Sequence, residues 1–247
     1  LDVIDGVSIA EQARVIKSEE EIACMRWAIA VSEHGIGKMK EALASGVTEA
    51  QLWGLLNYTN LANHGNWHDG RMLASGPRLN PWFQEASLRQ IEAGDLVGFD
   101  TDMIGPYGYC ADLSRTWKVG ERAPTNYEND LYKAAVDHLE YNKALLQPGR
   151  TFRELMELGQ ALPDKYRDQR YGVMYHGVGL CDEYPAIRYP EDWQAGGYDG
   201  VLEPGMCLCA EVYFGEVGGP CGVKLEDQVV ITESSSEVLS KYPLSLS

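Results

Sequence analysis

The first regular pattern along the chain is helical and begins near residue 18. Ser18 followed by Glu21 has the form of a capping box, in which each side chain accepts a hydrogen bond from the other residue's backbone N–H. In the stretch that follows, up to Leu43, apolar residues recur at intervals of three, four and seven, which places them on one face of a helix. The spacing predicts a helix that ends near Gly46 and a second helix over about 48–65.

A short phrase from this region occurs twice. The pattern Leu-x-x-Gly-x-Thr-x-x-x-Leu stands at 43–52 and again at 146–155, so every matched position is shifted by 103. A long helical pattern precedes each copy, the second over about 125–146, and another helix and strand-rich sequence follow. This order indicates two related halves. We predict an α/β fold in which the halves join into one curved antiparallel sheet, with helices on one face and a site on the other.

Acidic residues interrupt the strand-like segments of both halves. In the first half, 94–102 and 109–117 have the pattern of strand, turn and strand, and in the second half 206–213 and 223–231 have the same pattern. Within these otherwise apolar segments the acids of interest are Asp100, Asp102, Asp112, Glu211 and Glu226.

These acids predict a metal site. Side chains two apart on a strand share a face, so Asp100 and Asp102 should point together, and a hairpin would bring Asp112 beside them. Unpaired acids are costly inside strands, and a divalent cation is a common compensation. The alternative is that each acid lies on a solvated face or in a salt bridge, but repetition in both halves favours the metal. His176, before a Gly-rich turn, adds an imidazole, and this combination suits Fe, Mn, Co or Zn better than calcium.

The composition indicates a globular protein and argues against two classes of partner. The 247 residues are 45% hydrophobic and 23% charged, which is ordinary for one globular domain. We see neither a signal peptide nor an apolar run of about 20 residues, as a membrane span needs. The net charge of −16 argues against nucleic acid and anionic membranes as partners. Irregularly spaced cysteines predict reduced thiols and a cytoplasmic protein, with Cys207 and Cys209 as small core residues.

Several motifs resemble those of family M24, which includes creatinase, prolidase and methionine aminopeptidase. The segment 94–116 resembles the family's first metal motif, 176–185 its His motif, and 204–227 its two Glu motifs. The opening segment 14–28 is similar to the start of the catalytic domain in the prolidase branch. The resemblance implies the pita-bread fold and a catalytic domain over 1–247. It also implies that this branch's N-terminal domain is absent from the chain, and that the full-length protein is a homodimer.

The departures from the peptidase pattern concern residues that act on a peptide bond. The peptidases carry a His in the segment that matches Trp82 and a second His at the position of Asp182. Asp100 and Asp112 are one residue farther apart than the family's usual Asp pair, and Asp102 adds a carboxylate between them. In these respects, and especially over 99–112, the chain resembles the dimethylsulfoniopropionate lyases of the DddP type, which share the M24 fold.

That resemblance implies a reaction and roles for particular residues. The activity would be a carbon–sulfur lyase that splits dimethylsulfoniopropionate, a small zwitterionic sulfonium compound, into dimethyl sulfide and acrylate by metal-dependent β-elimination. Iron is the expected metal, with manganese, cobalt or zinc as alternatives. Asp182 would be the general base, Tyr171 a catalytic and substrate-binding residue, and Trp82 a substrate contact, whereas we expect the ring of Tyr175 in the core. The metal ligands would be Asp100, Asp102, Asp112, His176, Glu211 and Glu226.

Two other functions remain open at this point. A prolidase or Xaa-Pro aminopeptidase would need the His pair that this sequence lacks. A non-catalytic protein that binds through the M24 fold would typically have lost metal ligands, whereas here every ligand position remains acidic or His.

Overall fold

Four of the helices begin directly after a residue whose side chain caps them. In the computed structural model, which describes residues 3–247, Ser18 and Glu21 form the predicted capping box at the start of the second helix. Thr48, Thr125 and Thr151 form equivalent capping boxes. The helices are α1 (Val7–Ala13), α2 (Glu19–Ala42), α3 (Glu49–Ala62), α4 (Asn126–Leu145), α5 (Phe152–Leu158), α6 (Asp164–Arg167) and α7 (Trp193–Gly196), with short 3-10 helices η1 (Gly76–Leu79) and η2 (Pro106–Gly108).

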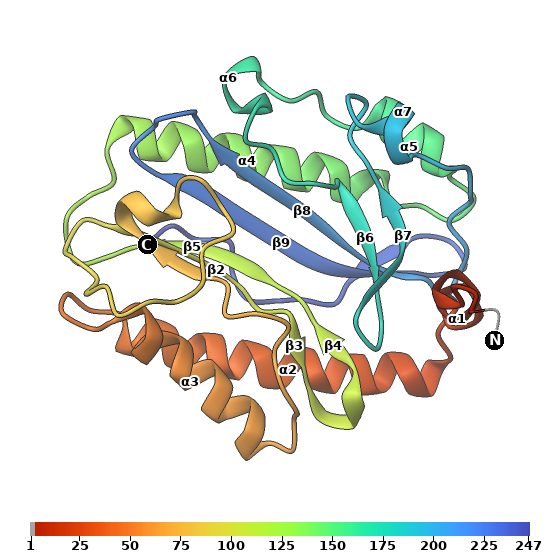
Figure 1. Cartoon of the computed structure of the whole chain (residues 1–247), viewed down its shortest axis with the longest axis horizontal. Coiled ribbons are helices and arrows are strands. Elements are labelled where there is room, and N and C mark those ends of the chain that lie inside the picture. Colours follow the sequence, from red (N-terminus) through yellow and green to blue (C-terminus); the bar gives the residue numbers. More distant parts are fainter. Residues whose placement is uncertain (1–2) are drawn as a thin grey trace.

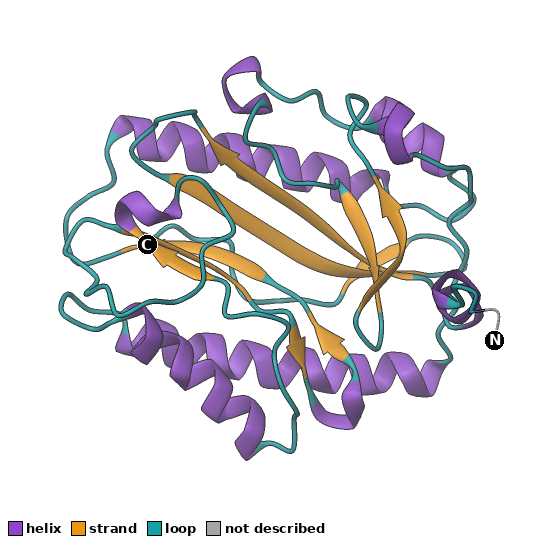
Figure 2. Cartoon of the chain, in the orientation of Figure 1, coloured by secondary structure: helices purple, strands orange, loops and turns teal. Residues whose placement is uncertain are grey.

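The strands form one large antiparallel sheet, the orange layer in Figure 2. Its order is β1-β2-β5-β9-β8-β6-β7, with β10 paired to β9, while β3 and β4 form a separate small hairpin. The strands are β1 (Leu73–Ser75), β2 (Leu96–Asp100), β3 (Met103–Ile104), β4 (Cys110–Ala111), β5 (Ser114–Lys118), β6 (Tyr175–Val178), β7 (Asp182–Ile187), β8 (Cys207–Gly215), β9 (Gly222–Ile231) and β10 (Ser236–Val238).

The predicted repeat is confirmed by the ends of the helices. α2 ends at Ala42 and α4 ends at Leu145, which are 103 positions apart. Gly46 and Gly149 also correspond, and both have positive φ angles, of 93° and 82°, where a side chain would be strained. The two halves meet where β5 pairs antiparallel with β9, so they join into one sheet as predicted.

The long helices of both halves cover the same face of this sheet (Figure 1). Lys143 of α4 donates to Asp227 of β9 at 2.6 Å, and Arg115 of β5 donates to the same carboxylate at 2.8 Å. Lys40 of α2 lies 5.2 Å from the ring centre of Trp117, which shares the strand face of Arg115. Both helices therefore pack on one side, as predicted.

The residues that alternate with these on the strands face the other side. Ser114 of β5 and Glu226 of β9 are paired in register and point away from α2 and α4. This side carries the acidic residues, so the prediction of helices on one face and polar groups on the other is confirmed.

All six cysteines are free thiols, as predicted. Within residues 3–247, no helix combines the length and the apolar character that crossing a bilayer requires.

Candidate metal centre and active site

Separate strands bring the predicted ligands to one place. Asp100 ends β2, Asp112 lies just before β5, and His176 is in β6. Glu211 and Glu226 face each other across β8 and β9. Potential ligand atoms of Asp112, His176 and Glu226 lie within 4.8 Å of one another, as do those of Asp100, Glu211 and Glu226. We call these five residues, together with Asp102, the acid cluster.

Asp102 joins the acid cluster from a loop. β2 ends at Asp100 and Asp102 has a φ of +37°, so the prediction that these two residues share one strand face is wrong. The chain turns here because the backbone N–H of Asp102 donates to Oδ1 of Asp112 at 3.2 Å. Oxygens of Asp100, Asp102 and Asp112 nevertheless lie within 4.8 Å of one another. A left-handed conformation is unfavourable for a residue with a side chain, and strained conformations of this kind cluster at active and ligand-binding sites.

His176 directs one ring nitrogen at three carboxylates. Its Nε2 lies 3.1 Å from Oε1 of Glu226, 3.4 Å from Oε1 of Glu211 and 3.6 Å from Oδ2 of Asp112. Ligand atoms that each lie about 2 Å from one ion are separated by roughly these distances. The imidazole and the three oxygens therefore have the spacing of groups around a single cation.

The contents of the acid cluster fit a divalent metal. Oε1 of Glu211 is buried and has no hydrogen-bond partner among residues 3–247, an arrangement that is costly unless a cation lies near. Carboxylates combined with one imidazole suit Fe, Mn, Co or Zn. The residues that would hold the ion are Asp100, Asp102, Asp112, His176, Glu211 and Glu226.

Crowding of acids shifts their pKa values. Burial and the neighbouring Glu226 raise the pKa of Asp100 to about 6. Burial and Asp100 raise the pKa of Asp102 to about 10, and burial raises that of Glu211 to about 8. Burial also disfavours the charged form of Glu226, but the Lys224 ammonium and His176 hold its pKa well below the usual range. The cluster thus resists carrying its full negative charge, a cost that a divalent cation would offset.

Lys224 is a site residue that the sequence analysis missed. Its side chain is fully buried, and its Nζ lies 2.8 to 2.9 Å from oxygens of Asp100, Glu211 and Glu226. It also donates to Oγ of Ser114, whose single hydroxyl hydrogen has two possible acceptors, Asp100 at 2.6 Å and Glu226 at 2.9 Å. The sequence contains a pattern that could have identified Lys224. It lies two positions before Glu226, and residues two apart on a strand share a face.

Cys209 was predicted to be a core residue, and in the structure it also lies beside the acid cluster. Cys207 and Cys209 are both buried, which confirms the prediction. However, Cys209 is paired in register with His176, and its Sγ lies within 4.8 Å of ligand atoms of Asp112, His176 and Glu226. A thiol therefore borders the acid cluster.

Asp182 lies at the edge of the acid cluster, where a small molecule can reach it. It begins β7, its side chain is 42% exposed, and its Oδ1 is 3.8 Å from Nδ1 of His176. Partial burial raises its pKa, an effect that the imidazole opposes. The next residue, Glu183, is anchored by Lys17 at 2.6 Å and by Arg14, so the start of β7 is fixed.

The predicted substrate residues line a small aromatic pocket beside the cluster. A cavity of about 220 Å³ is bordered by Trp82, Phe83, Tyr171 and Tyr213. Tyr171 stacks on Phe83 with ring centres 5.4 Å apart. The ring centre of Tyr171 is 4.6 Å from the Nζ of Lys224, so one wall of the pocket adjoins the acid cluster.

Trp82 lies near Lys224 at the aromatic pocket, whereas Tyr175 lies in the hydrophobic core. Trp82 is 5% exposed, and its ring centre lies 6.0 Å from the Nζ of Lys224. Tyr175 is fully buried and donates to the backbone carbonyl of Asn142 in α4, so its place in the core is confirmed.

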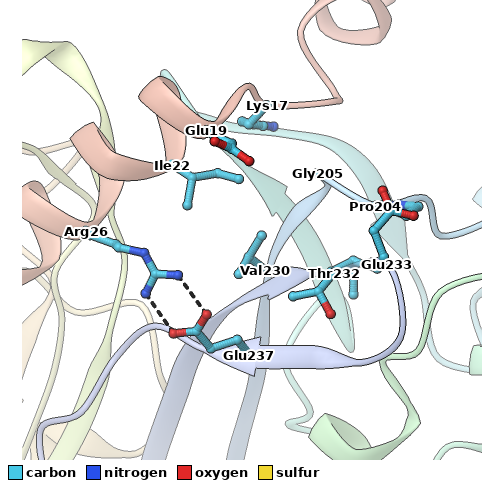
Figure 3. Close-up of a pocket in the computed structure, with 11 residues that line it drawn as sticks. Lys17, Glu19, Ile22, Arg26, Pro204, Gly205, Val230, Thr232, Glu233 and Glu237 are labelled. Atoms are coloured by element: carbon cyan, nitrogen blue, oxygen red, sulfur yellow. Dashed lines mark hydrogen bonds and ion pairs between the residues drawn. The ribbon is translucent and has the colours of Figure 1, made fainter.

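A larger pocket lies elsewhere and lacks this chemistry. Figure 3 shows a cavity of about 470 Å³ between the start of α2 and strands β9 and β10. Arg26 and Glu237 line it and form a bidentate ion pair at 2.7 and 2.8 Å. No member of the acid cluster lines this pocket. We therefore assign the candidate active site to the acid cluster and the aromatic pocket.

Comparisons with known proteins agree with this architecture. The chain is 43% identical over 247 residues to the dimethylsulfoniopropionate lyase DddP of Roseovarius nubinhibens, an alignment that covers 98% of this chain but 55% of the lyase. It is 28% identical over 238 residues to an Xaa-Pro dipeptidase of Pyrococcus furiosus, covering 94% of this chain and 65% of that protein.

A solved structure and a family model extend the comparison. An Xaa-Pro dipeptidase from Bacillus anthracis superposes with a TM-score of 0.83 at 27% identity, covering 98% of this chain and 66% of that one. This confirms the predicted pita-bread fold. The model for metallopeptidase family M24 matches residues 23–233. On this match, and on the fold that supports it, the chain belongs to metallopeptidase family M24.

Proposed function

We propose that this protein is a carbon–sulfur lyase that converts dimethylsulfoniopropionate into dimethyl sulfide and acrylate. The observation that carries the proposal is a carboxylate, Asp182, at an accessible position beside His176, where the peptidase pattern has a second His. A carboxylate is a poor donor to the oxyanion formed in amide hydrolysis but a suitable proton acceptor. The 43% identity to the DddP lyase supports the same reaction.

The proposed reaction is a β-elimination. Asp182 removes a proton from the carbon next to the substrate carboxylate, the electrons of that C–H bond form the C=C bond, and the C–S bond breaks with its electron pair leaving on sulfur. The products are acrylate and neutral dimethyl sulfide, and Asp182 is left protonated. When bound, a divalent metal supplies Lewis-acid stabilisation of the negative charge that develops near the carboxylate. The raised pKa of Asp182 makes it a stronger base than an exposed Asp.

The aromatic pocket would hold the other end of the substrate. A sulfonium is a soft, poorly hydrated cation, and such groups are attracted to the faces of aromatic rings. Tyr171 and Trp82 border the aromatic pocket next to the acid cluster. We propose that they orient the dimethylsulfonium group as the leaving group.

The experiment that tests this function is a direct assay of both candidate reactions. Protein loaded anaerobically with ferrous iron, or with manganese, is incubated with dimethylsulfoniopropionate, and dimethyl sulfide is measured in the headspace by gas chromatography. We expect release of dimethyl sulfide and no cleavage of an Xaa-Pro dipeptide. The opposite pair of results would reject the lyase and favour a dipeptidase.

A further inference from the structure

Lys224 contacts one carboxylate oxygen of Glu211 and one of Glu226, and the other oxygen of each faces His176. Its Nζ lies 2.8 Å from Oε2 of Glu211 and 2.8 Å from Oε2 of Glu226. The other oxygens, Oε1 of Glu211 and Oε1 of Glu226, face Nε2 of His176 at 3.4 and 3.1 Å. Each carboxylate thus uses one oxygen for the ammonium and presents the other toward His176.

The ammonium is fully engaged by this arrangement. It has three N–H donors, and its partners besides the two glutamates are Oδ2 of Asp100 at 2.9 Å and Oγ of Ser114 at 2.9 Å. The side chains of Lys224, Glu211 and Glu226 are 0% exposed. A buried cation held this tightly fixes the directions of the carboxylates around it.

We propose that Lys224 is a built-in counter-cation that holds Asp100, Glu211 and Glu226 together, and orients their free oxygens, before a metal ion binds. Buried carboxylates repel one another strongly, and removing the single ammonium among them would leave uncompensated charge. Lys224 therefore compensates the charge of the metal ligands while no ion is bound, and its own positive charge opposes the binding of the ion. The inference does not depend on the lyase reaction, because it concerns folding and metal binding.

The test is the thermal stability of Lys224→Met measured with and without metal. Methionine keeps the length of the side chain and removes its charge. Without metal, the melting temperature of the variant should fall by several degrees. Added Mn²⁺ should then raise the melting temperature more than it raises that of the wild type, because the ion takes over the neutralisation. Titration calorimetry with Mn²⁺ should show tighter binding to the variant, by tenfold or more.

The matched control is Lys118→Met, which removes another buried lysine. Lys118 pairs with Glu128 at 2.7 Å and donates to the Gly94 carbonyl, away from the acid cluster. We expect this variant to lose the same number of degrees with and without Mn²⁺. If Lys224→Met also behaves in this way, or keeps the wild-type melting temperature without metal, the proposal is wrong.

A second variant covers the case in which Lys224→Met does not fold. Lys224→Arg retains the positive charge, so it should fold without metal, with a melting temperature closer to that of the wild type than Lys224→Met reaches. Soluble Lys224→Met obtained only by refolding with Mn²⁺ would support the proposal. Failure of both variants to fold even with Mn²⁺ would overturn it, because shape rather than charge would then be what the site requires.

Discussion

Nε2 of His176 lies 3.1 Å from Oε1 of Glu226, although the two residues are 50 positions apart in the chain and stand on strands that are not neighbours. β8, which carries Glu211, lies between them, and β5 with its preceding Asp112 lies beyond β9. A cation among these residues would contact strands of both halves. Metal binding would therefore stabilise the join between the halves as well as prepare the site.

The first prediction concerns Asp112, which is 1% exposed and adjoins both His176 and the backbone of Asp102. Asp112→Ala removes a carboxylate at the centre of the proposed ligand set, so we expect bound metal to fall to background. The measurement is metal content by mass spectrometry after loading and desalting. Asp164→Ala, at a side chain that is 90% exposed, is the control and should retain full metal. Full metal content in Asp112→Ala would show that this residue is not a ligand.

The second prediction separates the base from the metal ligands. Asp182→Asn keeps the shape of the side chain and removes its ability to accept a proton. We expect near-normal metal content and a turnover that is lower by about 10²–10⁴, the usual range for loss of a general base. Dimethyl sulfide release and metal content are measured on the same preparation. A variant that retains near-normal turnover would move the role to another group, such as Tyr171.

The third prediction distinguishes two roles for Tyr171. Its ring adjoins Lys224 and borders the aromatic pocket, and Tyr171→Phe keeps the ring while removing the hydroxyl. If the ring only attracts the sulfonium, kcat and KM should change by less than about threefold. We expect this result for Tyr171→Phe and a rise in KM of at least tenfold for Tyr171→Leu. A large fall in kcat for the Phe variant would instead assign a hydrogen-bonding or proton-transfer role to the hydroxyl.

The fourth prediction is a pH dependence of metal binding. Burial raises the pKa of Glu211 to about 8 and that of Asp102 to about 10, so without metal these carboxyls keep their protons to a higher pH than exposed acids do. A metal binds the ionised forms and must displace those protons. Affinity should therefore increase as the pH rises from 6 to 9. Titration calorimetry in buffers of different ionisation enthalpy should show net proton release at pH 7, and an affinity that is constant over this range would contradict the prediction.

The fifth prediction concerns the buried ion pair between Lys17 and Glu183, near the start of β7. Glu183 and Lys17 form an ion pair in which the side chains are 0% and 2% exposed. Lys17→Met leaves a buried carboxylate with less compensation, so we expect a loss of about 3–5 kcal/mol in the free energy of unfolding. Lys38→Met breaks an exposed pair with Glu41 and should cost less than about 1 kcal/mol. Urea unfolding of both variants makes the comparison, and equal losses would show that burial of the Lys17 pair has no special effect.

Local patterns were enough to predict the helices and the repeat. Capping at Ser18 and the glycine at 46 act over a few residues; the helix begins directly after Ser18 and ends at Ala42, four positions before Gly46. The strand-like patterns over 206–213 and 223–231 likewise predicted β8 and β9, which carry Glu211 and Glu226, because the period of a strand is local. Resemblance to known motifs added the family, which the fold comparison bears out.

The sequence by itself determined the helix ends, the two related halves and the set of acids, since each depends on neighbours within a turn or a strand. Only the tertiary structure decided which groups surround those acids. The left-handed turn at Asp102 follows from its contact with Asp112 across a hairpin, and strand periodicity alone predicted the wrong position for it. Lys224 meets Asp100 only because β2, β5 and β9 lie side by side. Lys224 and Asp100 are more than a hundred positions apart, and no local pattern records their contact.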